Sequence, residues 1–305
     1  MKRAVSISLG SSERDKSIDI SMLGEKIRLE RIGTDGDLRK AQQLFKELDG
    51  VVDALGVGGA VLGLMVAGRW FPFHSVLPMV ADVQKTPVVD GTGLKLTLEA
   101  MIGETLQKEL GHYIKDKKVL IMNAVDRWGL AHTFVENSYQ CVFGDLIFSL
   151  GLPMPIRTEQ SVIHLANAII PLLSRLPFRW VYPIGEEQHK RTPRTPQFFQ
   201  WATVIAGDMH YISKYMPDDM QGKIVVTNTT TLGDVALLRK AGVKYLVTTT
   251  PVYDGRSFGT NVLEAAIVAL SERKDPVNYG DTKAYFATVR NYIEQIGLTP
   301  QIQEL

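Results

Sequence analysis

Cysteine is almost absent: Cys141 is the single one among 305 residues, so no disulfide can form within the chain. It lies in the apolar run YQCVF, where we expect a buried small side chain rather than a nucleophile. The six histidines are scattered, and the sequence has neither an H-E-x-x-H motif nor a Cys/His spacing typical of zinc. We therefore expect no bound metal.

An excess of charge of one sign is also missing. The 34 Lys and Arg residues face 33 Asp and Glu residues, which gives a formal net charge of +1. This balance gives no electrostatic reason to expect nucleic acid or an anionic membrane as a partner. No uncharged apolar run reaches the length of a membrane span, and the short run after Met1 is broken by serines, unlike a signal peptide. These absences favour a cytoplasmic protein whose partner is a small molecule.

The remaining composition is that of a globular protein, with 45% hydrophobic and 22% charged residues. Residues 116–272 alternate short apolar strands with helical periodicity, which is typical of parallel βαβ units. The sequence thus predicts a two-domain α/β protein with a C-terminal doubly wound, Rossmann-like parallel sheet. The predicted parts are an N-terminal α/β substrate domain at 1–115, a nucleotide-binding domain at 116–280, and a C-terminal helix at 281–305 that packs back.

The most informative stretch is 117–145, which reads strand, turn, helix, strand and acid. A strand that leads into a helix N-terminus presents free backbone N–H groups to an anion, and an acid about 20 residues later suits a ribose hydroxyl. Against G-x-G-x-x-G, the glycine positions become Ala124, Asp126 and Gly129, so one glycine of three is present. We expect cofactor contacts from Asn123, Arg127, Gly129 and Asp145. Asp126 fits a base or a cation ligand better than a pyrophosphate contact.

Polar residues follow nearly every strand of this repeat. In a parallel sheet these positions meet at the carboxyl edge, where ligands bind. Two threonine triplets, at 229–231 and 248–250, exceed what helix capping alone needs. Asn228, Thr229 and Thr249 are therefore expected to face a cofactor, although capping remains the alternative.

The loop before the last strong helix combines glycines with an arginine. Arg256 offers a planar fork to a carboxylate or phosphate, and Gly259 and Thr260 begin the helix. This loop is the strongest anion-site candidate of the chain. The alternative is a glycine-rich turn that carries a surface arginine.

A second glycine-rich turn, at 90–95, follows an apolar strand in the N-terminal part. Asp90 and Lys95 flank it and would suit proton transfer at a secondary alcohol. Acidic and basic residues at a helix start also serve the helix dipole and solubility, which is the competing interpretation.

Five segments of the chain resemble a bacterial family labelled quinate/shikimate 5-dehydrogenase. They are Val125-Asp126-Arg127-Trp128-Gly129, Tyr182-Pro183-x-Gly185-Glu186, Ile205-Ala206-Gly207-Asp208, Thr227-Asn228-Thr229-Thr230-Thr231 and Gly255-Arg256-Ser257-Phe258-Gly259-Thr260-Asn261. The resemblance implies an NAD(P)-dependent oxidoreductase that acts on a hydroxylated carboxylic acid. Lys95, Asp90 and Asp126 would then be catalytic, with NAD favoured over NADP because Asp145 would repel a 2′-phosphate. A homodimer is a further expectation.

Two other hypotheses stay open at this point. The first is a non-redox, Rossmann-like protein that binds a phosphorylated or carboxylated metabolite through Arg127, Arg256 and the threonine clusters. The glycine-poor turn and Asp126 favour it. The second is an ATP-using protein, which the lack of a G-x-x-x-x-G-K-[ST] motif disfavours.

Overall fold

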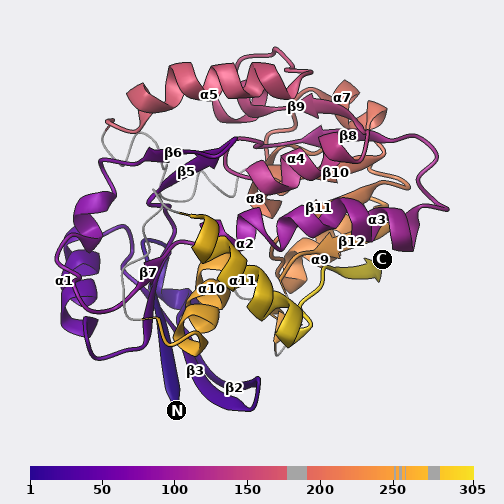
Figure 1. Ribbon diagram of the computed structural model, residues 1–305. Helices are drawn as coiled ribbons and strands as arrows, with labels where there is room; N and C mark the ends of the chain where they lie inside the picture. The colour runs from indigo at the N-terminus through magenta and orange to yellow at the C-terminus, as the bar shows by residue number, and fades with distance from the viewer. Residues whose placement is uncertain (177–190, 251, 254–255, 258, 274–281) are drawn as a thin grey trace. The chain divides into compact units, whose positions relative to one another are not determined.

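The computed structural model describes residues 1–176, 191–250, 252–253, 256–257, 259–273 and 282–305 (Figure 1). The chain forms two compact units, each built from separate segments. The first unit contains Met1–Thr97, Ile169–Ile184 and Gly259–Leu298. The second unit contains Leu98–Ala168, Gly185–Phe258 and Thr299–Leu305. Both units have an α/β architecture with a mainly parallel sheet, as the sequence predicts.

The sheet of the first unit has the order β2-β3-β1-β4-β7. Its strands are β1 (Lys2–Ser8), β2 (Lys16–Met22), β3 (Glu25–Gly33), β4 (Ala54–Gly58) and β7 (Val88–Val89). β1 pairs in parallel with β3 and β4, β4 pairs in parallel with β7, and β2 is antiparallel to β3. A separate hairpin, β5 (Gly63–Val66) with β6 (Arg69–Pro72), lies outside this sheet.

Helices of the first unit follow from local sequence signals. α1 (Leu38–Leu48) begins after Asp37, whose carboxylate accepts from the N–H groups of Arg39 and Lys40. α10 (Thr260–Leu270) is buried at nearly every position and packs against β1 and β4. α11 (Lys283–Ile296) lies beside α10 and also contacts α2 (Thr92–Leu96) (Figure 1). A helix that is apolar on all sides, such as α10, needs cover on all sides, and these neighbours provide it.

The second unit has a six-stranded sheet with the order β15-β12-β11-β10-β8-β9. Its strands are β8 (Lys118–Ile121), β9 (Gln140–Phe143), β10 (Val204–Ala206), β11 (Ile224–Thr227), β12 (Tyr245–Thr248) and the antiparallel β15 (Gln301–Glu304). The five parallel strands have the order 2-1-3-4-5 when numbered along the chain. In this order the chain reverses its direction across the sheet between β8 and β10, which is where open α/β sheets bind ligands.

Helices precede and separate these parallel strands. They are η3 (Glu99–Met101), α3 (Ile102–Leu110), α4 (Trp128–Glu136), η4 (Asp145–Ser149), α5 (Glu159–Leu173), α7 (Pro196–Trp201), α8 (Met209–Tyr215) and α9 (Leu232–Lys240). On one face of the sheet, apolar side chains of the strands form a core cluster with α7, α8 and α9. Members include Leu120, Ile205, Phe199, Ile212 and Leu238, all fully buried. Because Leu120 of β8 and Ile205 of β10 both belong to this cluster, it joins the two strands to the helices on this face.

The structure divides the chain differently from the predicted ranges 1–115, 116–280 and 281–305. α10 follows the last parallel strand of the second unit but belongs to the first unit, because it packs on β1 and β4. Residues 92–110 form three helical pieces, α2, η3 and α3, and the unit boundary falls among them, between Thr97 and Leu98. Sequence periodicity reports which face of a segment is apolar, but not against which sheet that face packs.

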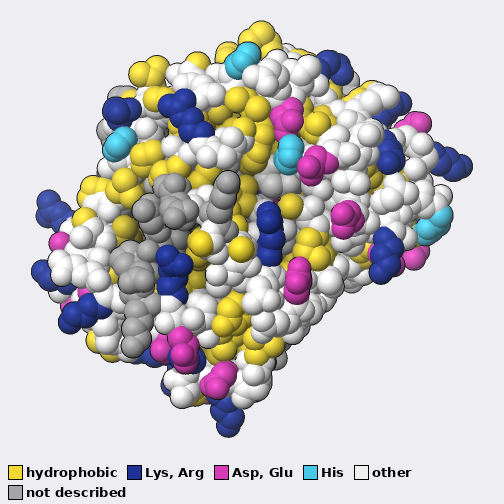
Figure 2. Space-filling view, in the orientation of Figure 1, with side chains coloured by type: hydrophobic (Ala, Val, Ile, Leu, Met, Phe, Trp, Pro, Cys, Tyr) yellow, Lys and Arg dark blue, Asp and Glu magenta, His cyan; other side chains and the backbone are white. Residues whose placement is uncertain are grey.

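The distribution of surface charge and the length of the apolar helices bear on the expectations about nucleic acid and membranes. On the face drawn in Figure 2, the charged side chains of the described residues are interspersed and form no patch of one sign. Among the helices that the structure describes, none has the length and apolar character to cross a bilayer.

Gly91 is required by the turn before α2, and this gives a first prediction. It has φ +94°, and a Cβ at this position would collide with Thr260 Oγ1. Gly91→Ala should therefore lower the free energy of unfolding by about 2–5 kcal/mol, because left-handed strain and overpacking add. Gly68 has φ +78° but open space where a Cβ would lie, so Gly68→Ala carries the strain term alone. Urea titrations should separate the two variants; equal losses would contradict the packing argument.

Candidate functional site

Charged side chains gather at the carboxyl edge of the second unit's sheet, where β8 and β10 end. We call this group the switch-point cluster: Glu99, Asn123, Asp126, Arg127, Asp145 and Asp208. Four of these six residues are sequence-predicted site residues, namely Asn123, Asp126, Arg127 and Asp145. All six belong to the same unit.

Arg127 is the centre of the cluster. Its side chain is 4% exposed and donates from Nε and Nη2 to the two carboxylate oxygens of Asp208, at 3.2 and 2.5 Å. Its Nη1 donates to Glu99, which is 1% exposed. Burial lowers the pKa of Arg127, but Asp208 and Glu99 outweigh it, so the pKa lies above its ordinary value. Arg127 is thus a permanent cation that two carboxylates hold in place.

Asn123 locks the end of β8 to the residue after β10. Its Nδ2 donates to Asp208 Oδ2 at 3.0 Å, and its Oδ1 accepts from the N–H of Asp208 at 3.2 Å. The amide therefore uses both its ends on one neighbour and fixes the position of the Asp208 carboxylate.

A ribose contact would require the Asp145 side chain to point away from the turn, but it points toward the turn. Its carboxylate accepts from the N–H groups of Ala124 and Val125, at 3.1 and 2.9 Å. Burial raises the pKa of Asp145 to about 6, although these hydrogen bonds act against the shift. A protein carboxylate thus occupies amides that the predicted dinucleotide turn would offer to a pyrophosphate. Gly129 is buried inside the first turn of α4.

Asp126 and Asp208 are the partly exposed acids of the cluster, with side-chain exposures of 30% and 27%. Asp126 Oδ2 lies 3.7 Å from Arg127 Nε. Tyr211 on α8 lies near enough to both acids to interact with their charges. Burial raises the pKa of Tyr211 to about 12, and the negative charges of Asp126 and Asp208 add to the increase. The surface that the cluster presents to solvent is therefore dominated by carboxylate oxygens.

The remaining cofactor candidates of the second unit lie at the ends of β11 and β12. Asn228 and Thr229 are partly exposed, and the Asn228 carbonyl accepts from the Thr250 hydroxyl at 2.6 Å. Thr249 is 1% exposed, and its hydroxyl has no hydrogen-bond partner among the described residues. Thr231 caps α9 in a capping box with Asp234, so part of the threonine pattern is capping. The side chain of Arg256 lies outside the described residues.

The other predicted residues belong to the first unit. Asp90 is buried and accepts from the N–H groups of Leu62 and Thr92, at 2.7 and 3.0 Å. Lys95 is buried on α2, and Thr260 begins α10 after Gly259. The structure therefore groups Asp90 and Lys95 in one unit and Asp126 in the other. Their catalytic roles stay predictions.

A buried carboxyl group that the sequence did not reveal lies beside Asp90. Glu264 on α10 is 0% exposed; it accepts from the Tyr285 hydroxyl of α11 and from the N–H of Leu94 at 3.2 Å. Burial, and next the negative charge of Asp90, raise the pKa of Glu264 to about 8. At neutral pH this group is mostly a neutral acid, which lets it sit in an apolar helix interface.

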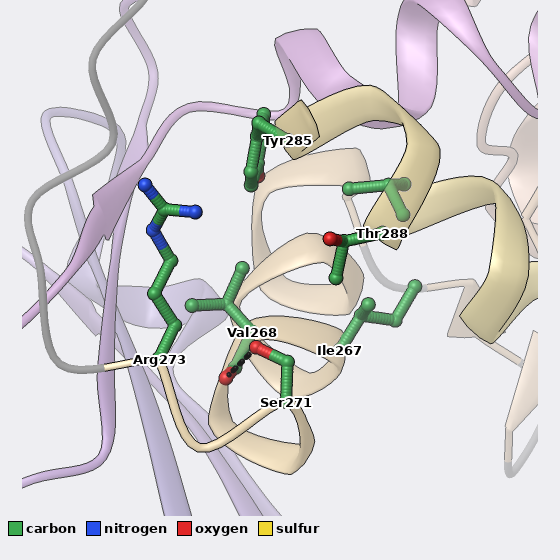
Figure 3. Close-up of a pocket in the computed structure, with 7 residues that line it drawn as sticks. Ile267, Val268, Ser271, Arg273, Tyr285 and Thr288 are labelled. Atoms are coloured by element: carbon green, nitrogen blue, oxygen red, sulfur yellow. Dashed lines mark hydrogen bonds between the residues drawn. The ribbon is translucent and has the colours of Figure 1, made fainter. Parts of the chain in front are cut away.

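A cavity of about 150 Å³ lies between α10 and α11, and Tyr285, the partner of Glu264, is one of the residues that line it (Figure 3). Arg273 reaches along it with its guanidinium 5.6 Å from the centre of the Tyr285 ring. Ser271 and Thr288 line it but direct their hydroxyls to backbone carbonyls, of Val268 at 2.8 Å and of Ala284 at 3.0 Å. The hydroxyl groups of Ser271 and Thr288 are thus hydrogen-bonded to the backbone of the helices that flank the cavity.

Sequence reasoning missed Glu99, Glu264 and Tyr285. Glu99 and Glu264 are charged residues at apolar positions of helical segments, which is the one signal that could have singled them out. Asp208 ends one of the five segments that carry the family resemblance, but its pairing with Arg127 depends on strand order, which local sequence does not encode.

Several solved structures are similar to the chain at low levels. A protein from Mycobacterium smegmatis in complex with beta-D-fucofuranose is 11% identical, with a TM-score of 0.36, and the match covers 100% of this chain and 99% of that one. A galactofuranose binding protein is 12% identical at a TM-score of 0.37, with coverages of 95% and 99%. A protein provisionally described as a malic enzyme (malate oxidoreductase) is 13% identical at 0.35, with coverages of 95% and 84%. No curated protein matches the chain.

The family models that match the chain correct the enzymatic interpretation. They describe domains of unknown function over residues 3–90 and 93–305, not the shikimate dehydrogenases that the resemblance implied, so the predicted family membership is wrong. The predicted NAD(P)-dependent oxidoreductase function depended on that membership and is wrong with it. The arrangement of Asp145 gives a physical reason, since the turn amides of the supposed dinucleotide site already bind a carboxylate. Binding of NAD, or less favourably NADP, stays an untested prediction.

Two family models match consecutive parts of the chain. One, described as "Domain of unknown function (DUF8753)", matches residues 3–90, and the other, described as "Domain of unknown function (DUF8754)", matches residues 93–305. The second match covers more than half of the chain. The chain belongs to the DUF8754 family.

Proposed function

We propose that the protein is a non-redox binding protein whose small-molecule ligand contacts the switch-point cluster. One observation carries this proposal: Asp126 and Asp208 are partly exposed at the carboxyl edge of the sheet, while Arg127, Glu99 and Asn123, which surround them, are buried. Replacing a buried ionic network by apolar residues is often neutral or stabilising, so stability alone does not account for it. Its position, at the reversal between β8 and β10, is where such sheets bind ligands.

The cluster also meets the geometric needs of recognition. Arg127 donates two hydrogen bonds and Asn123 Nδ2 donates one to the Asp208 carboxylate, while the Asp208 N–H donates to Asn123 Oδ1 and holds the amide in place. A fixed acceptor loses little conformational entropy when a ligand binds, which is the advantage of a preorganised site. Cytoplasmic location and a homodimer stay predictions.

A thermal-shift screen with neutral, cationic and anionic metabolites tests the proposal. A ligand raises the apparent stability by RT ln(1 + [L]/Kd), so at least one compound should raise the Tm of the wild type. Asp126→Asn should reduce that shift strongly, and Asp208→Asn should do the same. Asp116→Asn is the control, because Asp116 is an exposed acid just before β8, at the opposite end of that strand. Equal shifts in all four proteins, or no shift with any compound, would overturn the proposal.

A further inference from the structure

His132 on α4 lies between two glutamates, outside the switch-point cluster. Its Nδ1 lies 2.5 Å from Glu159 Oε1, and its Nε2 lies 3.3 Å from Glu136 Oε1. Glu136 is the last residue of α4, whereas Glu159 is the first residue of α5. One imidazole ring therefore joins two helices that a strand separates in the sequence, and all three residues belong to the second unit.

The two contacts of His132 need two ring protons. A neutral imidazole has one N–H group and one lone pair, whereas the imidazolium ion donates from both nitrogens. With a neutral ring, a lone pair would face one carboxylate, and the two glutamates would lie near each other without a cation between them. The geometry of the contacts is therefore that of the protonated ring. Histidine is the side chain whose charge ordinarily changes between about pH 5 and 8.

Neighbouring groups hold the ring and its partner on α5 in place. Trp128 stacks on His132, with 6.1 Å between the ring centroids and 13° between the ring planes. The Thr158 hydroxyl accepts from the Ser161 N–H at 3.2 Å and so caps the start of α5. The negative charge of Glu159 in this first turn also suits the helix dipole. Its side chain is 23% exposed, so its contact with His132 is partly shielded from solvent.

Other titratable or charged groups lie near the same two helices. Cys141 on β9 interacts with the charge of Glu159, but burial, and next this charge, raise the pKa of the thiol to about 12, so it stays neutral. His164 on α5 pairs through Nε2 with Gln160 at 2.9 Å. η3 and α3 also pack on α4. In the described part of the chain their charged residues make no ion pair with His132; they are Glu99, Glu104, Lys108 and Glu109.

We infer that the imidazolium ion of His132 forms a pH-sensitive clasp, which fastens the first turn of α5 to α4. At the acid end of the histidine range, the protonated ring attracts both carboxylates and holds this turn closed. As the pH rises and the ring loses a proton, one contact is lost and the two carboxylates repel each other, so the turn opens more often. The response is local, because partly exposed ion pairs contribute little to global stability. The clasp is independent of the proposed binding site.

Amide hydrogen exchange, followed by NMR on the intact chain, tests the clasp. The reporters are the N–H groups of Ser161 and Val162, which both donate to the carbonyl of Thr158 in the first turn of α5. Protection factors, corrected for the intrinsic effect of pH on exchange, are compared at about pH 5.5 and about pH 8. In the wild type, protection should be about 3- to 10-fold higher at the lower pH, the size expected for a partly exposed ionic contact.

Three variants assign this ratio to a residue. His132→Gln should bring the ratio to about 1, because glutamine can donate to Glu159 but does not titrate. Glu159→Gln should remove most of the ratio, since the charged partner on α5 is lost. His164→Gln is the matched control, because it removes the other histidine of these two helices and should keep the wild-type ratio. A wild-type ratio near 1, a ratio that survives in His132→Gln, or a ratio that disappears in His164→Gln would overturn the inference.

Discussion

Arg127→Met should lower the free energy of unfolding by about 3–5 kcal/mol, the loss expected when one partner of a buried ionic network is removed. Methionine keeps the length of the side chain but removes the cation that faces Glu99 and Asp208. Glu99 is 1% exposed, so water cannot replace the lost charge. Urea unfolding at neutral pH measures the loss. Because the chain has two units, the transition of the second unit should be the one that shifts.

A surface pair and a double variant control for this result. Arg3 pairs with Glu30 at 2.6 Å, but the two side chains are 37% and 18% exposed, so Arg3→Met should cost about 0.2–1 kcal/mol. Combining Arg127→Met with Glu99→Gln should recover part of the loss, because the buried negative charge is removed as well. A loss at Arg127 no larger than that at Arg3, with no recovery in the double variant, would show that the network is not energetically coupled.

The same residues show how far the sequence could lead. Strand ends, helix starts and turn residues can be recognised from local sequence patterns. These signals were enough to place Asn123, Asp126, Arg127 and Asp145 at one edge of one sheet. Their roles did not follow from those patterns. Arg127 finds Asp208 because β10 lies next to β8, and Asp145 binds the turn because β9 lies on the other side. Such pairings depend on the strand order, which is a property of the whole fold.

Edge strands and a buried acid illustrate a second limit. The five parallel strands between Lys118 and Thr248 lie in the stretch 116–272, where the sequence predicts alternating strands and helices, since those signals are local. Strands β2 and β15 were not predicted: β15 (QIQE) has a single apolar residue, whereas β2 (KSIDISM) does alternate Ile18, Ile20 and Met22 with polar residues, and that signal was missed. Glu264 was hidden in the apolar helix at 261–270, and only the packing of α10 against α2 and α11 shows that it is buried.

Burial of Glu264 should make the protein less stable as the pH rises. Its pKa is raised to about 8 in the folded chain, against 4.5 for the free group, so the folded state holds a proton that the unfolded state has lost. The contribution of Glu264 to stability therefore falls with increasing pH between these two values and changes no further well above pH 8. The total change for a fully buried group is on the order of 5 kcal/mol. Asp145 has a pKa of about 6, so the fall above that pH is assigned to Glu264.

Glu264→Gln should flatten this dependence between pH 6.5 and 8.5, because glutamine has no proton to lose in that range. The variant need not be as stable as the wild type, since only one of the two terminal atoms of glutamine can accept, whereas both carboxyl oxygens of Glu264 accept, from the Leu94 N–H and from the Tyr285 hydroxyl. The slope of unfolding free energy against pH is therefore the measurement, not its absolute value. Glu47→Gln on the exposed face of α1 should keep the wild-type slope. An unchanged slope in Glu264→Gln would mean that the carboxyl group is ionised in the folded chain, which would require Tyr285 and the α2 amides to compensate a buried charge.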